Sequence, residues 1–257
     1  MIEVLGLSKS FAQGAGRHRR VVHAVQGVSF TAANGCITGL LGSNGAGKTS
    51  TLRMAAALIE PDAGRVRVDG IDVAQQPGKA LARLGVLSDA RGLYPRLTAR
   101  ENIVYFGRLH GLSRLDAEAR AAELAQRLDM RELLDRRTDG FSQGERMKTA
   151  LARALVHDPP NIVLDEPTNG LDVLATRALR EVLRQLRDEQ GKCIIFSTHI
   201  MQEVERLCDH VVVIARGRTV VQGTVADLNA ISGGSDFEET FVKLAFSAPE
   251  TEPAVRP

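Results

Sequence analysis

Aromatic residues and cysteines are scarce in this sequence. It contains no tryptophan, two tyrosines and eight phenylalanines, so few side chains are available to stack on a planar ligand. The three cysteines, Cys36, Cys193 and Cys208, form no Cys-x-x-Cys pair, and the first two stand beside apolar runs. This pattern indicates small, buried, apolar side chains in a reducing compartment and argues against a disulfide framework.

Long apolar runs and a strong net charge are also missing. No apolar run approaches the ~20 residues that a helix needs to cross a bilayer. Residues 1–4 do not begin the basic and then apolar pattern of a signal peptide. If the protein serves a membrane process, a separate protein must span the membrane. The formal net charge of +2 is too small to indicate a nucleic-acid binder held by bulk electrostatics.

The apolar pattern predicts an α/β protein. With 257 residues, 44% of them hydrophobic, the chain can form one large α/β domain or two small ones. Runs of valine, isoleucine and leucine are typical of strands in a largely parallel sheet, and they occupy residues 28–31, 37–41, 66–68, 85–87, 162–164, 194–197 and 211–215. Helical spacing occupies residues 51–59, about 116–137, 146–156 and 171–189. Arg216-Gly217 lies between two apolar pairs and predicts a β-hairpin.

Residues 42–49 read Gly-Ser-Asn-Gly-Ala-Gly-Lys-Thr, which matches the phosphate-binding loop pattern between a predicted strand and a predicted helix. Glycines let successive backbone N–H groups converge on phosphate oxygens, and the helix N-terminus adds a favourable dipole. Lys48 would neutralise the β and γ phosphates, and Thr49 would offer its hydroxyl to Mg²⁺. The predicted nucleotide-binding residues of this segment are Gly42, Ser43, Asn44, Gly45, Ala46, Gly47, Lys48, Thr49 and Ser50.

A second candidate segment is the apolar run 162–164, which ends in Asp165 and Glu166. Asp165 fits a role in positioning Mg²⁺. Glu166 is one residue further on and points to the opposite side of a strand, where it could polarise an attacking water. Acidic residues at strand ends are common, so this pair alone is weak support for catalysis.

The next residues, Pro167–Asp172, distinguish between families, because phosphate-loop kinases and small GTPases have no reason to carry them. Residues 165–172 resemble the second nucleotide motif and adjoining D-loop of the ATPase subunits of ABC transporters. The resemblance extends over nearly the whole chain. It implies that the nucleotide is ATP, that Mg²⁺ accompanies it, and that hydrolysis is coupled to transmembrane transport.

The family carries a signature Leu-Ser-Gly-Gly-Gln, and residues 141–145, here called the signature segment, read Phe-Ser-Gln-Gly-Glu at that place. In the family this segment closes over the γ-phosphate of ATP bound to the opposing subunit. The resemblance therefore assigns Ser142 and Gly144 to nucleotide binding, and a hydroxyl and an N–H at a helix N-terminus suit an anion. Gln143 and Glu145 depart from the pattern, and the charge of Glu145 would weaken the phosphate contact.

Two more residues take their roles from the resemblance. His199 follows the predicted strand 194–197, as the switch histidine of the family does, and would hold the γ-phosphate and water geometry beside Glu166. Phe11 stands where the family has an aromatic residue that stacks on adenine. A lone histidine is more often structural, and an aromatic residue here could instead be packing.

Asp89 marks the clearest departure from the family, which usually has glutamine at the end of the strand before the helical block. A carboxylate can still approach Mg²⁺ or its water, but it cannot donate a hydrogen bond as an amide does. Asp89 is therefore either a metal-site residue or the start of a turn. Together with residues 91–95 it resembles the sodium-efflux (NatA-type) exporter branch.

The fold class predicted from the resemblance is α/β, with a phosphate-loop (RecA-like) core, an N-terminal antiparallel β subdomain and an inserted helical subdomain. The ATPase domain would cover residues 1–230. Its β-rich start would take about 1–34 and 62–72, its core about 35–60 and 159–225, and its helical subdomain about 90–158. Residues 231–257 would form a short helix, opened by a capping box at Ser235, and a disordered tail.

The resemblance also implies partners. A second copy, or a sister ATPase, would pair head to tail, and an integral-membrane permease would bind the helical subdomain near residues 89–97. The chain would then be cytoplasmic and peripheral on the inner face of the cell membrane, most simply as the subunit of an exporter. No nucleic acid is expected. The alternative is a non-transport ABC ATPase that acts on nucleic acid or ribosomes, although such proteins usually carry a long coiled coil or two ATPase domains.

Overall fold

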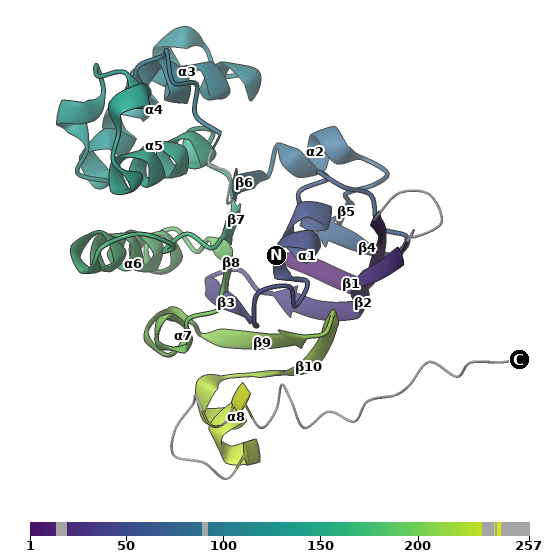
Figure 1. Cartoon of the computed structure of the whole chain (residues 1–257). Coiled ribbons are helices and arrows are strands. Elements are labelled where there is room, and N and C mark those ends of the chain that lie inside the picture. The colour runs from purple at the N-terminus through teal and green to yellow at the C-terminus, as the bar shows by residue number, and fades with distance from the viewer. Residues whose placement is uncertain (14–19, 89–91, 233–238, 240, 243–257) are drawn as a thin grey trace, which may run out of the picture.

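A six-stranded sheet forms the centre of the molecule (Figure 1), in a computed structural model that describes residues 1–13, 20–88, 92–232, 239 and 241–242. Its strands, in order across the sheet, are β10 (Arg218–Gly223), β9 (His210–Ala215), β3 (Cys36–Leu41), β8 (Cys193–Thr198), β7 (Asn161–Asp165) and β6 (Leu84–Leu87). The strands from β9 to β6 run parallel, and β10 turns back antiparallel as the second strand of the predicted hairpin. The carboxyl ends of β3, β7 and β8 therefore meet at one edge.

A second sheet is antiparallel throughout and lies beside the first. It contains β2 (Arg20–Ala32), β1 (Ile2–Gln13), β4 (Ala63–Val68) and β5 (Ile71–Asp72), in that order. Helix α1 (Lys48–Ala55) packs between the two sheets, and its buried Leu52 and Met54 share one apolar cluster with Val4 of β1 and Leu40 of β3. The helix that follows the phosphate-binding loop is thus held from both sides.

The helical subdomain is a separate lobe at one end of the central sheet (Figure 1). It consists of α3 (Ala99–Leu109), α4 (Arg114–Arg127), two short 3-10 turns (Arg131–Leu133 and Thr138–Gly140) and α5 (Gln143–Leu155). Four further helices are α2 (Pro77–Leu81), α6 (Val173–Asp188), α7 (Met201–Leu207) and α8 (Val225–Ser232). This arrangement confirms the predicted fold class, an α/β core with an antiparallel subdomain and a helical insertion.

Two helices differ clearly in extent from the sequence prediction. The helix expected over about 116–137 begins at Arg114, after the N-cap Ser113, and ends at Arg127, because Asp129 adopts a left-handed φ of 48° that breaks the helix. The helix expected over 51–59 begins at Lys48 and ends at Ala55. The side chain of Ser113 caps α4 by accepting a hydrogen bond from the N–H of Asp116 (3.1 Å).

Two predicted features lie outside the described residues: Asp89, and the capping box at Ser235 with the tail that follows it. The residues at 91–95 that share in the exporter resemblance are described only from residue 92 onward. Across the described ranges, no helix has both the length and the apolar character required to cross a membrane.

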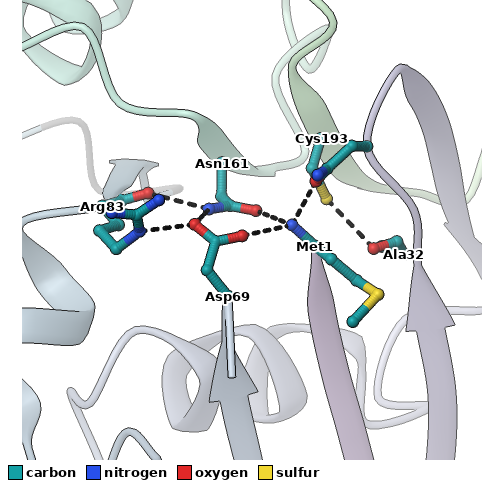
Figure 2. A network of polar contacts seen from close by, with 7 residues as sticks. Met1, Ala32, Asp69, Arg83, Asn161 and Cys193 are labelled. Atoms are coloured by element: carbon teal, nitrogen blue, oxygen red, sulfur yellow. Dashed lines mark hydrogen bonds and ion pairs between the residues drawn. The ribbon is translucent and has the colours of Figure 1, made fainter. Parts of the chain in front are cut away.

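A polar network joins the two sheets, as Figure 2 shows. The amino group of Met1 donates to Asp69 (2.7 Å) and Asn161 (2.7 Å), and it also contacts Asn34. Asp69 accepts further hydrogen bonds from Arg83 (2.7 Å) and Asn161 (2.9 Å). Burial opposes ionisation of Asp69, but these donors lower its pKa overall. The network therefore fixes β1, the β4–β5 turn and the start of β7 together.

Helix α6 is joined to α7 by a row of arginines. The largely buried Arg180 and the buried Glu203 form an ion pair at 3.5 Å, and Arg184 donates to the carbonyl of Arg206 at 2.6 Å. Arg187 binds Asp209 at 2.7 Å just beyond α7. These contacts align the two helices that follow β7 and β8.

Candidate functional site

The loop from residue 42 to Lys48 connects β3 to α1 and wraps around the amino group of Lys48. That group donates to the carbonyls of Gly42 (2.7 Å) and Ser43 (3.2 Å) and is almost completely buried. A Cβ atom at Gly42 would overlap the carbonyl oxygen of Ile214, and one at Gly47 would lie 2.5 Å from the carbonyl of Ala24. Only glycine permits this close approach of backbones.

The hairpin between β9 and β10 holds the same loop from outside. Gly217 donates its N–H to the carbonyl of Ala46 (2.9 Å) and accepts from the N–H of Gln26 (2.7 Å). The phosphate-binding loop therefore touches the antiparallel sheet on one side and the last two strands of the central sheet on the other. Its shape depends on segments that are distant in the sequence.

Asp165, the last residue of β7, lies beneath the start of α1. One of its carboxylate oxygens accepts hydrogen bonds from the hydroxyls of Thr49 (3.1 Å) and Ser197 (2.6 Å). Mg²⁺ in nucleotide sites is held by hard oxygen ligands, often one or two from the protein with phosphates and waters completing the shell. The adjacent hydroxyl and carboxylate of Thr49 and Asp165 fit that donor set. Sequence reasoning did not anticipate Ser197, which also accepts from the N–H of Glu166 (3.0 Å).

Glu166 lies between a lysine and a histidine. One carboxylate oxygen is 3.2 Å from Nζ of Lys48, and the other is 2.9 Å from Nδ1 of His199, which follows β8. The side chain of Glu166 is only 12% exposed. Its backbone adopts a left-handed φ of 47°, a conformation that non-glycine residues rarely adopt and that is found at functional sites. Of the predicted site residues, Glu166 thus contacts both Lys48 and His199 directly.

These residues line a cavity of about 600 Å³ that opens between the two sheets. Phe11 of β1, 39% exposed, lies on one wall opposite its antiparallel partner Val22 of β2. Lys9 lies 5.9 Å from the centre of the Phe11 ring. The described residues that line the cavity are Phe11, Val22, His23, Ala24, Gln26, Asn44, Gly45, Ala46, Gly47, Lys48, Thr49, Ser50, Glu166, Asn169, His199 and Arg216.

Comparison with known proteins agrees with this geometry. The ABC transporter family matches residues 25–169 of the chain. The ATP-binding protein NatA of Bacillus subtilis (strain 168) is 47% identical over 225 residues, which are 87% of this chain and 91% of that protein. The chain belongs to the ABC transporter family. It is an ATP-binding, ATP-hydrolysing subunit, and the non-transport alternative is set aside.

Two other relatives and a solved structure also support membership of the ABC transporter family. The linearmycin resistance ATP-binding protein LnrL of Bacillus subtilis (strain 168) is 35% identical over 87% of this chain and 70% of its own length. The Nod factor export ATP-binding protein I of Paraburkholderia xenovorans (strain LB400) is 42% identical over 84% and 71%. A structure described as an ATP binding subunit of an ABC transporter superposes with a TM-score of 0.82 at 30% identity, covering 95% of this chain and 98% of that one.

The signature segment of this ABC ATPase opens α5, and none of its residues is among the described residues that line the cavity. Ser142 is the N-cap of α5 and accepts from the N–H of Glu145 (3.3 Å). The carboxylate of Glu145 turns back to the N–H of Ser142 (2.7 Å) and to Arg136 (3.0 Å). The Ser142 N–H, followed by the Ser142 hydroxyl and Arg136, lowers the pKa of Glu145. Its charge is therefore compensated within the ABC ATPase itself.

Several residues of the cavity were missed by sequence reasoning. Val22, His23 and Gln26 come from β2, and Arg216 comes from the β9–β10 hairpin, where its backbone φ is 50°. The pairing of β1 with β2 brings Val22 beside Phe11. Only the register between these two strands could have indicated that Val22 lines the cavity. Arg216 was predicted as a hairpin residue, but its place at the cavity depends on the order of strands in the central sheet.

Proposed function

We propose that this chain binds Mg²⁺ and ATP in the described cavity, hydrolyses the ATP with Glu166 as general base, and drives export through a separate membrane permease. The observation that carries the proposal is the meeting of Lys48, Glu166 and His199 within hydrogen-bonding or ion-pair distance in one cavity. A largely buried carboxylate beside a positioned histidine suits proton abstraction from water.

The remaining residues of the site would bind either the phosphates of ATP or Mg²⁺. Backbone N–H groups of the phosphate-binding loop and the N-terminus of α1 would bind the β and γ phosphates, with Lys48 adding its positive charge. Thr49 and Asp165 would hold Mg²⁺, which supplies electrostatic stabilisation of the charge on the transferred phosphoryl group. Phe11, exposed at the cavity wall, would stack on the adenine ring.

Hydrolysis then depends on water held beside Glu166. The carboxylate would accept a proton from that water, and His199, hydrogen-bonded to the same carboxylate, would keep its orientation and contact the γ-phosphate. Ser197 accepts from the backbone N–H of Glu166 and so supports the unusual backbone of this residue. Each of these groups is positioned by the end of β7 or β8.

A head-to-tail pair of subunits completes the proposed site. Among the described residues that line the cavity, neither Ser142 nor Gly144 is present, so the signature segment would reach ATP only on a second subunit. Val173 and Leu174, 80% and 77% exposed, begin α6, in which the next residue, Ala175, lies close to Gly144 of the signature segment. Exposed apolar side chains at this place support a protein contact. A second copy is the simplest partner, and a sister ATPase is the other candidate.

The helical subdomain would bind the permease. Tyr94 and Tyr105 pack edge to face at 5.6 Å, and both remain more than 40% exposed beside the similarly exposed Leu109. Exposed aromatic and aliphatic side chains are common at the centres of protein interfaces. Because relatives such as the Nod factor export protein are ATPases of exporters, we propose export, with this chain peripheral on the inner face of the membrane.

Co-purification tests the transport assignment. Glu166→Gln protein, loaded with ATP, should recover a stoichiometric multi-span membrane protein from mildly solubilised native membranes, because trapped ATP keeps the complex closed. Lys48→Ala protein, which is expected to bind ATP poorly, is the matched control and should recover less. Recovery of nucleic acid or ribosomes without a membrane protein would contradict the proposal.

A mixed dimer tests the pairing. One chain carries both Ser142→Arg and Glu166→Gln, and its partner is wild type. In a head-to-tail dimer the Glu166→Gln site then faces an intact signature segment, so we expect one occluded ATP per mixed dimer. No occluded ATP in the mixed dimer would refute the head-to-tail arrangement.

A further inference from the structure

Gln143, which replaces a glycine of the family signature, makes a contact that glycine cannot make. Its side-chain Nε2 donates a hydrogen bond to the backbone carbonyl of Asn169 at 2.9 Å. The next residue, Gly170, has a left-handed φ of 70°, and a Cβ atom there would overlap the Gln143 amide. The amide therefore packs closely against the backbone of residues 169–170.

This contact connects two segments that serve different purposes. Gln143 directly follows Ser142, the N-cap of α5 in the signature segment. Asn169 lines the ATP cavity of its own chain, and its N–H donates to the carbonyl of Glu166 at 3.1 Å. The Gln143 side chain thus directly connects the start of the signature helix to the loop that carries the proposed general base.

We propose that Gln143 is a positioning residue that couples the two ATP sites of the dimer. The inference rests on the proposed head-to-tail pairing, in which Ser142 contacts ATP on the partner while Glu166 acts on ATP in its own cavity. When the signature segment closes on the partner's ATP, the Gln143 amide moves the 169–170 backbone and with it Glu166. Occupancy of one site then sets the geometry of the other.

The chemistry of the contact explains why an amide side chain suits position 143. A backbone carbonyl requires a donor, which an amide supplies and an ionised carboxylate does not. The contact is exposed, so its loss should change the free energy of unfolding little. Its effect should instead be seen in catalysis, because a misplaced general base slows turnover without loosening nucleotide binding.

The test compares Gln143→Glu and Gln143→Gly with wild type in the permease complex. The control is Gln126→Glu, the same amide-to-carboxylate change at an exposed position of α4. We expect kcat to fall about 3- to 10-fold, the scale of one lost hydrogen bond. The Hill coefficient for ATP should fall from near ~2 towards ~1. ATP affinity and Tm should stay at wild-type values, as should every property of the control.

A double-variant cycle tests the contact itself. Gly170→Ala should lower kcat more in the wild-type background than in the Gln143→Gly background, because the added methyl group meets the amide only in the former. Equal effects in both backgrounds would overturn the inference, as would a wild-type Hill coefficient of ~1 or Gln143 variants that match wild type. Absence of ATP hydrolysis in wild-type protein would instead overturn the proposed function on which the inference depends.

Discussion

Exchange of Glu166 for glutamine removes one charge and leaves the shape of the side chain unchanged. In the wild-type protein one carboxylate oxygen accepts from the Lys48 ammonium. The other oxygen also only accepts, so its hydrogen bond with His199 requires that Nδ1 carries the proton and donates it. In Glu166→Gln the amide oxygen must face Lys48, which only donates. The amide NH₂ then faces His199, whose Nδ1 must accept, so the imidazole proton moves to Nε2.

The size of the expected fall in turnover follows from the proposed role of Glu166 as general base. Loss of a general base lowers turnover by roughly 10²–10⁴, equivalent to about 2.7–5.5 kcal/mol on the barrier. ATP affinity should be unchanged or higher, because the variant removes a carboxylate 3.2 Å from the lysine that binds the phosphates. The free energy of unfolding should change little, since both neighbours keep a hydrogen-bond partner of suitable polarity.

Three measurements on the same protein check this prediction. Phosphate release gives kcat, equilibrium titration gives ATP affinity, and ¹⁵N chemical shifts of the imidazole report the tautomer of His199. Glu189→Gln, the same exchange at an exposed residue after α6, is the matched control and should leave all three unchanged. Turnover of Glu166→Gln within about 3-fold of wild type would refute the base role. An unchanged tautomer would refute the hydrogen-bond arrangement.

Three further predictions concern binding and stability. Lys48→Ala should weaken ATP binding about 10- to 100-fold, the scale of a charged hydrogen bond, and unchanged affinity in calorimetry would contradict the loop assignment. Asp69→Asn should lower the free energy of unfolding by about 1–3 kcal/mol at neutral pH in urea titrations. Because the folded state lowers the pKa of Asp69, this stabilisation exists above the unfolded pKa of ~4 and is lost as pH falls through the folded value; a difference that persisted in acid would refute it. Glu203→Gln should lower the free energy of unfolding by roughly 3–5 kcal/mol, because it leaves the largely buried charge of Arg180 without its counter-ion. Arg180→Met combined with Glu203→Met should recover most of that loss in thermal unfolding, and no recovery would mean that packing around the pair matters more than its charges.

Local patterns predicted the central sheet and the phosphate-binding loop well. The apolar runs at 37–41, 162–164 and 194–197 lie within β3, β7 and β8, because strands buried on both faces need continuous apolar sequence. The loop at 42–49 could be read because its glycines and Lys48 are adjacent in sequence. The hairpin at Arg216 was likewise visible, since a two-residue turn is a local signal.

Features set by distant contacts could not be read in this way. Apolar and polar residues alternate only weakly along strand β1, which is stabilised by pairing with β2 and β4. Its sequence pattern alone therefore did not give its length. Helix α4 ends at Arg127 although apolar spacing continues, because the chain turns at Asp129 to pack against α5. The partner of Gln143 is also tertiary, which is why this residue appeared in the sequence only as a departure from the family pattern. The partner of Glu145 is the N–H of Ser142, a local contact that caps the same helix.

The hairpin that holds the phosphate-binding loop has a consequence for synthesis of the protein. The loop leaves the ribosome long before Gly217, the residue that donates to its Ala46 carbonyl. Pairing of such distant segments is slow and comes late in folding. A nascent chain that ends before β10 therefore contains the phosphate-binding loop but lacks the hydrogen bond from Gly217 that holds the loop in place. ATP should bind only once β9 and β10 have joined the sheet, so that nucleotide binding marks the completion of folding.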